Sequence, residues 1–260
     1  MITSIHNPKI QWVRALQGRG RERRAAQAFV VEGVRLAEEA LAAGWEAQLV
    51  LYTADLSQRG QAVLEGFAGQ GSAVEQVTAE VLSAASDTPA PQGLLVALSL
   101  KTLPLPDWID FAFIADGVRD PGNLGTMLRT AAAAGVEAVF LPPGTVDPFS
   151  PKVLRSAMGA HFRLPVLAWP WDAIRAQLTR SALQVYLAAA QAGEPYTRAD
   201  FRSPLALLVG GEAEGAGTEG QNLAQVVVHI PMPGGSESLN AAVAAAILLF
   251  EVVRQRRQPA

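Results

Sequence analysis

The sequence contains no cysteine and few histidines, and these absences exclude several kinds of site. Zero cysteines rule out disulfides, iron–sulfur clusters and thiolate zinc sites. The three histidines, His6, His161 and His229, lie far apart along the chain, so we expect no metal. No apolar run reaches the roughly 18 residues that a membrane span needs. The first residues, MITSIHNPKI, lack the pattern of a signal peptide, so we expect a cytoplasmic protein away from membranes.

Charge is scarce overall but unevenly distributed. The net charge is −3, yet residues 1–35 have seven basic and two acidic side chains, a local balance of +5, and the other 225 residues therefore sum to −8. A basic segment on an acidic body is typical of a surface that faces a polyanion. A solvated helix face explains the same pattern equally well, so charge alone leaves both interpretations open.

The order of strand-like and helix-like runs predicts an α/β protein in two parts. Short runs alternate over residues 27–98, and residues 99–107 contain prolines without any period, as in a linker. We divide the chain into residues 1–102, a linker at 103–107, and residues 108–260. The last part predicts a mostly parallel, doubly wound sheet, in which a strand at 110–116 and a loop at 117–125 precede a helix at 126–135.

Three loops leave the carboxyl ends of predicted strands, where open parallel sheets bind ligands. The first loop continues as DPGNLGTMLR (120–129), with Asn123 near a helix N-terminus and Arg129 nearly two turns further on. On such a helix the arginine can lean back over the loop. Taken singly, Asn123 is well explained as an N-cap. A solvated helix charge would explain Arg129, but the apolar run TAAAAGVEAVF that follows it disfavours this interpretation.

The second loop, LLVGGEAEGAG (207–217), begins with two glycines that follow a hydrophobic strand. A G-x-G-x-x-G pattern occupies residues 215–220, but only QNLA separates it from the next strand, too short for the helix of a dinucleotide fold. We therefore interpret Gly210 and Gly211 as positions where the backbone contacts a flat ligand, with Glu212 beside them.

The third loop, GGSES (234–238), resembles the nucleophile elbow G-x-S-x-G around Ser236, but Ser238 replaces its last glycine and no histidine follows Ser236 in the chain. A serine hydrolase is therefore disfavoured, and it remains an alternative. Between Leu239 and Val253 only Asn240 and Glu251 are polar. A helix apolar all round predicts burial on every side, and a subunit interface is the natural second cover.

Together these loops resemble the SpoU (TrmH-type) family of 2′-O-ribose RNA methyltransferases in the SPOUT superfamily. The matching motifs are NLGTMLRTA, LVGGEAEG and IPMPGGSESLNAAVAAAILLFE, in the family's order and spacing, with SPKVLRSAMGAHFRLPV between the first two. Near the N-terminus, SIHNPKIQWVRAL and FVVEGVRLAEEAL resemble the RNA-recognition domain of the ribosomal-RNA members. That domain is similar to a small ribosomal-protein α/β fold.

The resemblance implies a deep trefoil knot in the C-terminal sheet, S-adenosylmethionine as cofactor, and a homodimer formed through the C-terminal domain. It implies RNA as substrate, with ribosomal RNA favoured over transfer RNA. The implied catalytic residues are Asn123, Arg129, Glu212, Ser238 and Asn240. The implied cofactor-binding residues are Gly210, Gly211, Ile230, Met232 and Leu239. Basic residues expected to contact RNA are Lys9, Arg14, Arg21, Arg23 and Arg24.

Methyl transfer to a ribose needs the 2′-oxygen placed in line with the methyl group and freed of its proton, and positioning alone removes several kcal/mol of barrier. Our hypothesis is that Arg129 meets the phosphate beside the target ribose. Because arginine stays protonated, stabilising the developing alkoxide is an easier role for it than acting as a base. The alternative is an inactive RNA-binding assembly factor, which has no need of the whole polar cluster.

Overall fold

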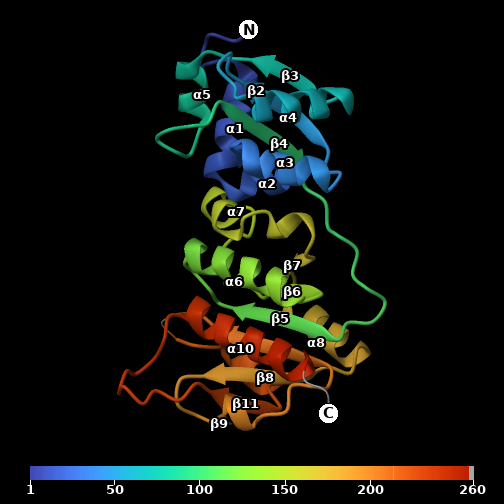
Figure 1. Ribbon diagram of the computed structural model, residues 1–260, viewed down its shortest axis with the longest axis vertical. Helices are drawn as coiled ribbons and strands as arrows, with labels where there is room; N and C mark the ends of the chain where they lie inside the picture. The colour runs from blue at the N-terminus through green and yellow to red at the C-terminus, as the bar shows by residue number, and fades with distance from the viewer. Residues whose placement is uncertain (213, 258–260) are drawn as a thin grey trace. The chain divides into compact units, whose positions relative to one another are not determined.

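The computed structural model describes residues 1–212 and 214–257, and its internal contacts divide the chain into two compact units (Figure 1). The first unit contains Met1–Lys101 and Phe149–Phe162. The second contains Thr102–Pro148 and the chain from Arg163 onward. This differs from the sequence-based division, which placed all of residues 108–260 in one domain.

The first unit is built around a small mixed sheet. Its elements are α1 (Pro8–Gly18), α2 (Gly20–Ala26), β1 (Ala28–Glu32), α3 (Val34–Ala42), β2 (Ala47–Tyr52), α4 (Gln58–Gly69), β3 (Ala73–Gln76), α5 (Ala79–Ala85), β4 (Leu94–Ser99), α7 (Pro151–Ala157) and the 3-10 helix η1 (Ala160–Phe162). The strand order is β1-β4-β2-β3, and β4 is antiparallel to both β1 and β2. Consequently β1, β2 and β3 all run in one direction and end at the same edge.

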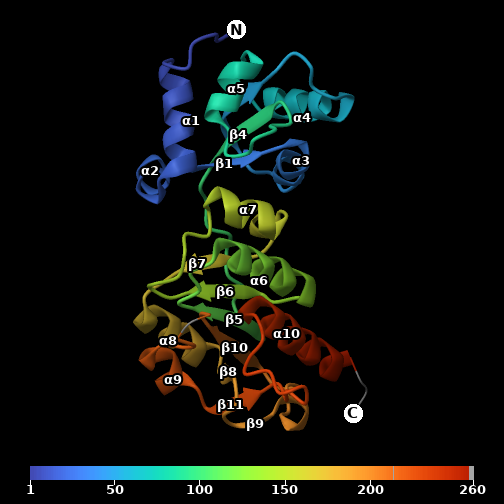
Figure 2. The same ribbon diagram turned by 90° about the vertical axis from the view of Figure 1, so that its left-hand side faces the viewer.

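Helices cover both faces of this sheet because its strands are apolar on both sides. Ile10 and Leu16 of α1 and Leu82 of α5 pack with the strands on one face, and Figure 2 shows α3 and α4 on the other face. The start of α1 is fixed by Asn7, whose side chain accepts a hydrogen bond from the Lys9 amide at 2.9 Å. This is an ordinary N-cap.

Residues 149–162 group with the first unit because their aromatic side chains complete its core. The ring of Phe149 lies 4.9 Å from that of Phe29, and Phe162 lies 5.3 Å from Trp45. Phe29 and Trp45 are themselves fully buried. Aromatic pairs at these separations contribute about 0.5–1.5 kcal/mol each beyond the area that they bury. Periodicity along the chain does not indicate this long-range packing, so the sequence did not predict it.

The second unit contains the larger sheet. Its elements are β5 (Phe111–Asp116), α6 (Pro121–Ala134), β6 (Ala138–Leu141), β7 (Val166–Ala168), α8 (Trp171–Arg180), β8 (Gln184–Ala189), β9 (Glu194–Pro195), the 3-10 helix η2 (Tyr196–Arg198), β10 (Leu205–Gly210), α9 (Thr218–Leu223), β11 (Val226–His229) and α10 (Ala241–Arg257). The strand order is β7-β6-β5-β10-β8-β11-β9, and every pairing is parallel. Figure 2 shows α6 and α10 on one face of the sheet and α8 and α9 on the other.

This arrangement confirms the predicted α/β class with a parallel C-terminal sheet. The central strands β5, β6 and β10 are buried along their whole length, as expected when helices cover both faces. The trefoil knot stays a prediction.

Helix α6 begins at Pro121, five residues before the start expected from the sequence. Asp120 is its N-cap, and the Asp120 carboxylate accepts a hydrogen bond from the Asn123 amide at 2.8 Å. Proline suits the first helical position because it has no N–H to satisfy there. The expected loop at 117–125 is therefore wrong beyond residue 120. Since Asp120 is the cap, the interpretation of Asn123 as an N-cap is also wrong, and its side chain is available for other contacts.

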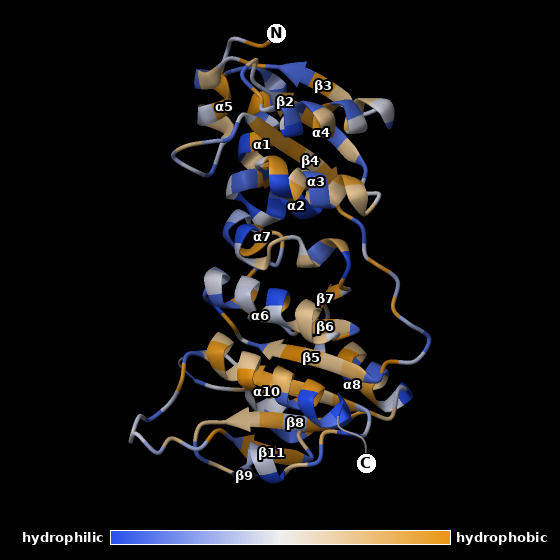
Figure 3. Ribbon diagram, viewed as in Figure 1, coloured by the Kyte–Doolittle hydropathy of each residue, from blue (hydrophilic) through white to orange (hydrophobic). Residues whose placement is uncertain are grey.

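Helix α10 is apolar along most of its length and hydrophilic at its C-terminal end (Figure 3). It packs against α6 and β10. The sequence predicted a helix buried on every side. Within one chain α10 is not, because Val243 and Phe250 are 48% and 49% exposed. An apolar stripe of this helix therefore faces outward.

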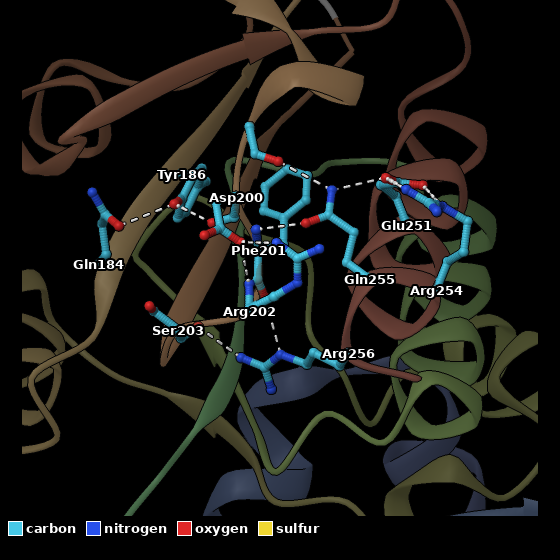
Figure 4. A network of polar contacts seen from close by, with 11 residues as sticks. Gln184, Tyr186, Asp200, Phe201, Arg202, Ser203, Glu251, Arg254, Gln255 and Arg256 are labelled. Atoms are coloured by element: carbon cyan, nitrogen blue, oxygen red, sulfur yellow. Dashed lines mark hydrogen bonds and ion pairs between the residues drawn. The ribbon is translucent and has the colours of Figure 1, made fainter. Parts of the chain in front are cut away.

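A network of polar contacts fixes the C-terminal end of α10 to the segment before β10 (Figure 4). Gln255 is at its centre: Oε1 accepts from the Phe201 amide at 2.9 Å, and Nε2 donates to the Ala199 carbonyl at 3.0 Å and to Glu251 at 2.8 Å. Arg254 donates to both carboxylate oxygens of Glu251, at 2.7 and 2.6 Å. The Arg254 contact lowers the pKa of Glu251 against the opposing effect of burial.

Two kinds of feature do not occur in the part of the chain that the structure describes. None of its helices is long and apolar enough to cross a bilayer. Its histidine, aspartate and glutamate side chains form no group of three or more suited to a metal ion.

Candidate active site

A cavity of about 1080 Å³ lies in the second unit, at the carboxyl ends of β8, β10 and β11. These strands are neighbours in the sheet, and open parallel sheets bind ligands at such an edge. Three of the predicted catalytic residues, Glu212, Ser238 and Asn240, line it. All five residues proposed for cofactor binding line it as well: Gly210, Gly211, Ile230, Met232 and Leu239.

The two glycines after β10 are required by a close crossing of main-chain segments. A Cβ added at Gly210 would lie 2.1 Å from the Ala216 nitrogen and from the Gly215 carbonyl carbon. One added at Gly211 would lie 2.3 Å from the Gly117 carbonyl oxygen. Separations this short exclude any side chain, because main chain on both sides cannot yield. The sequence interpretation assigned these glycines to ligand contact only, and the structure adds this second reason.

Three polar residues from three distant loops are joined by hydrogen bonds at the cavity. Asn123 Nδ2 donates to Glu212 Oε1 at 2.5 Å, and Asn240 Nδ2 donates to Asn123 Oδ1 at 3.0 Å. Asn240 also caps α10, since its Oδ1 accepts from the amides of Ala242 and Val243 at 2.9 and 3.2 Å. Each carboxamide thus uses both its donor and its acceptor, which fixes its orientation. The first turn of α6, the loop after β10 and the start of α10 are held in one arrangement.

Arg129 and Ser238 lie outside this chain of hydrogen bonds. Arg129 is exposed on α6 and makes no hydrogen bond or ion pair with any residue in 1–212 or 214–257. Ser238 is exposed at the cavity and likewise bonds to no other described residue. Ser236 is exposed and has no histidine partner in the described chain, so nothing supports its role as a nucleophile. Both Arg129 and Ser238 are free to contact a ligand or a substrate.

The sequence did not single out one wall of the cavity, formed by residues 187–192 at and after the end of β8. Gln221, Ala244 and Leu248 also line the cavity and were not predicted. The useful signal would have been strand order, because β8 pairs with β10 and β11 and its carboxyl end therefore meets theirs. Strand order cannot be derived from the local pattern of this chain.

Four of the five basic residues predicted to contact RNA are exposed on α1 and α2: Lys9, Arg14, Arg21 and Arg24. Lys9 forms an ion pair with Glu75 of β3. Arg14 lies on the exposed side of α1, away from the core residues of that helix. This placement is compatible with a polyanion-facing surface.

The structure does not support the prediction that the fifth residue, Arg23, contacts RNA. It is only 4% exposed, and its guanidinium donates to the carbonyl oxygens of Leu16 and Gln17 near the end of α1. Helix ends leave such carbonyls without partners, and a buried arginine satisfies them. The structure therefore gives Arg23 a role inside the domain and does not support it as an RNA contact.

The first unit has a cavity of its own, of about 600 Å³, at the carboxyl ends of β1, β2 and β3. Its charged lining residues are Arg35, Asp55 and Arg59. The three loop motifs contribute nothing to it, so we place the chemistry at the cavity of the second unit.

Comparison with known proteins matches one family model to each half of the chain. Residues 110–250 match the SpoU rRNA Methylase family, and residues 7–96 match the MRM3-like substrate binding domain. The chain is 34% identical over 251 residues to the 23S rRNA (guanosine(2553)-2'-O)-methyltransferase RlmP of Bacillus subtilis, covering 96% of this chain and 98% of that protein.

Solved structures also match over nearly the whole length. An AdoMet-bound rRNA methyltransferase from Sinorhizobium meliloti superposes with a TM-score of 0.88 and 31% identity, covering 99% of this chain and 98% of that one. The SpoU methyltransferase AviRb from Streptomyces viridochromogenes, in complex with AdoMet, gives a TM-score of 0.86 at 28% identity, with coverage of 96% and 99%.

The fold and the site define an open parallel α/β protein whose ligand cavity lies at the carboxyl ends of its strands. Because the family match spans more than half of the sequence, the chain belongs to the SpoU rRNA methylase family. The resemblance inferred from the three loop motifs is thereby confirmed.

Proposed function

We propose that the protein transfers a methyl group from S-adenosylmethionine to a ribose 2′-oxygen of ribosomal RNA. The observation that carries this proposal is the joined set Asn123–Glu212–Asn240 at a cavity lined by every residue expected to bind the cofactor. The printed activities of relatives such as RlmP support the substrate class. The MRM3-like match over residues 7–96 supports RNA recognition by the first unit.

The cavity suits a cofactor with a positive charge and a flat ring. Its described lining includes the carboxylates Glu212, Glu214 and Glu237 and no lysine, arginine or histidine. Apolar side chains such as Leu187 and Met232 supply the surface against which a ring packs. When bound, S-adenosylmethionine supplies an electrophilic methyl group at its sulfonium.

The polar residues then act by position and charge. Asn123 and Asn240 are held by their mutual hydrogen bond and by Glu212, so they orient the substrate without rearranging. Arg129 has no partner within the described chain, which leaves its guanidinium for an RNA phosphate or for the oxygen that becomes negative. Ser238, exposed at the cavity, is placed to contact the ribose or the cofactor. The exposed residues Lys9, Arg14, Arg21 and Arg24 supply further RNA contacts.

The apolar stripe of α10 supports the proposed homodimer. Val243 and Phe250 are exposed by about half, on a helix that already packs against α6 on another side. A second copy covering this stripe would bury both side chains, of which Val243 lies in the first turn after the cap residue Asn240. Dimerisation through α10 and a cytoplasmic location are parts of this proposal.

Two measurements test it. Mapping 2′-O-methyl positions in ribosomal RNA from cells with and without the gene should reveal a site that disappears with the gene and returns with a plasmid copy. Calorimetric titration with S-adenosylmethionine should show binding to the wild-type protein. An unchanged methylation map and no heat of binding would instead support an RNA-binding assembly factor.

The residue assignments need a separate control. Arg129→Ala should lose methyl transfer while keeping cofactor affinity, and Arg23→Lys, a change away from the cavity, should retain transfer if folding is intact. Near-wild-type turnover by Arg129→Ala would remove Arg129 from the site.

A further inference from the structure

A buried carboxylate lies next to the cavity, and none of the three motifs includes it. Asp116 is the last residue of β5, opposite Gly210 in the register with β10, and it is 5% exposed. In the described chain it forms no ion pair with a basic side chain. Burial raises the pKa of this carboxyl, and the Gly217 amide opposes that effect. A buried carboxylate without a cationic partner lowers stability, so we expect its remaining contacts to serve the structure or the function of the site.

The main contact of Asp116 is with the loop that forms one wall of the cavity. Asp116 Oδ2 accepts a hydrogen bond from the Gly217 amide at 2.7 Å. The two preceding residues, Gly215 and Ala216, line the cavity. Three other hydrogen bonds hold the same turn from within its own segment: the Gly215 amide to the Gly211 carbonyl at 3.1 Å, the Gln221 amide to the Gly217 carbonyl at 2.9 Å, and Gln221 Nε2 to the Ala216 carbonyl at 2.7 Å. Among the described residues, the Asp116 contact is therefore the hydrogen bond that ties this turn to a neighbouring strand.

The Asp116 carboxylate also lies close to Gly220, where an added side chain would meet it. A Cβ added at Gly220, in helix α9, would lie 2.7 Å from Asp116 Oδ2 and 3.4 Å from Trp171 Cη2. The same Cβ would lie 3.3 Å from Leu208 Cδ1. Glycine at 220 thus keeps the carboxylate in place against Gly217. Asp116 is therefore a buried carboxylate packed against Gly217 and Gly220 and not a solvent-exposed surface charge.

We propose that Asp116 is a positioning residue for the cofactor: its carboxylate holds the Gly215–Gly217 turn in the shape that completes the cavity wall. It touches neither the reacting atoms nor the RNA and acts only through that wall. This inference rests on the proposed function, since the occupant of the cavity is S-adenosylmethionine. It predicts a defect in cofactor affinity that exceeds any defect in the transfer step.

The test compares Asp116→Ala with Asp116→Asn in the full-length protein. Alanine removes the acceptor, whereas the asparagine Oδ1 can still accept from the Gly217 amide. Calorimetric titration with S-adenosylmethionine should show a dissociation constant raised about tenfold or more for alanine, the equivalent of one buried hydrogen bond left unmade, and within about threefold of wild type for asparagine. At saturating cofactor, the turnover of Asp116→Ala should fall by less than its affinity.

Glu251→Gln is the matched control, because Glu251 is also a buried acid of the second unit, at 8% exposure, but bonds within the network at the end of α10. It should alter thermal stability and leave cofactor affinity unchanged. If Asp116→Ala does not fold, Gly220→Ala replaces it, since its Cβ would displace the carboxylate without removing it. This variant should also weaken cofactor binding.

The outcomes separate the two proposals. Wild-type protein that binds no S-adenosylmethionine refutes the proposed function itself. If the wild-type protein binds S-adenosylmethionine and the dissociation constant of Asp116→Ala or Gly220→Ala lies within about twofold of the wild-type value, the positioning role alone is refuted. It is also refuted if Asp116→Asn binds the cofactor as weakly as Asp116→Ala.

Discussion

The two sheets of this chain each have a cavity at the edge where parallel-running strands end, yet they build it by different means. In the first unit the lining includes the charged side chains Arg35, Asp55 and Arg59. In the second, the lining includes Gly210 and Gly211, where main-chain segments cross closely, and its charged side chains are all acidic. The lining of the first cavity can therefore change by substitution of side chains, whereas close main-chain packing constrains the lining of the second.

The difference follows from how closely the loops cross. At the second cavity a Cβ added at Gly210 would meet backbone at 2.1 Å, whereas at Gly93, which lines the first cavity, it would meet the side-chain oxygen of Thr53 at 2.6 Å. Where main chain meets main chain, no rotamer change relieves a clash. We expect substitutions at the second cavity to affect folding and binding together, and those in the first unit to separate the two.

The largest effect should come from Gly210→Ala. The overlap with Ala216 and Gly215 should destabilise the second unit by about 3 kcal/mol or more. Gly69→Ala, at the end of α4, is the matched change in open space and should be neutral or stabilising by about 0.5–1 kcal/mol. Urea unfolding of both variants measures the contrast, and equal midpoints would show that the crossing is not a constraint.

A second contrast separates capping from orientation. Asn240→Asp keeps the oxygen that caps α10 but loses the donor to Asn123, so methyl transfer should fall about 10- to 100-fold with little change in stability. Asn240→Ala should also lose about 1 kcal/mol of stability with the cap. Thr78→Ala removes only the cap of α5 in the first unit, and it should lower stability without lowering turnover. Full activity in Asn240→Asp would contradict the orienting role.

Acid stability provides the third contrast. The Arg254 contact lowers the pKa of Glu251 in the folded protein below its value in the unfolded chain. The stability that Glu251 contributes is therefore complete above the unfolded-state pKa and is lost as the pH falls through the folded-state pKa. Glu251→Gln should therefore destabilise the second unit by about 1–2 kcal/mol at neutral pH and less in acid, flattening that limb of the profile. Glu75 of the first unit also has a lowered pKa, from Lys9, but this pair is solvent-exposed. Thermal melts between neutral and acidic pH should show a smaller change for Glu75→Gln.

The smallest effect concerns the charge of the second cavity. Glu237 lines it and is exposed, so its attraction for a cationic ligand is screened. Glu237→Gln should weaken S-adenosylmethionine about twofold while leaving the neutral S-adenosylhomocysteine unchanged. Competition titrations measure the ratio, and an equal loss for both ligands would assign Glu237 a structural role.

Much of this organisation was predictable because it is local. Asp110–Asp116 reads as a buried strand, and the glycines and polar residues of the three loops stand at strand ends, so the sequence predicted both the parallel sheet and the residues that meet at its edge. The structure joins Asn123, Glu212 and Asn240, whose catalytic roles stay predictions.

The parts that could not be predicted depend on contacts across the chain. A basic residue in a basic segment looks the same whether it faces solvent, like Arg24, or satisfies carbonyls in the interior, like Arg23. The N-cap of α6 was misplaced because Asn123 and Asp120 are both good capping residues. The role of Asp116 could not be predicted because its hydrogen-bond partner, Gly217, lies far along the sequence.

The return of residues 149–162 to the first unit has a consequence for synthesis and for domain exchange. On the ribosome, the first 101 residues emerge without Phe149 and Phe162, so the faces of Phe29 and Trp45 that these rings cover stay open until β5 and β6 of the second sheet have been made. Expressed alone, residues 1–101 should be soluble only poorly. A recombination point at the linker would cut through one core, so exchange of recognition domains between relatives must move two segments together.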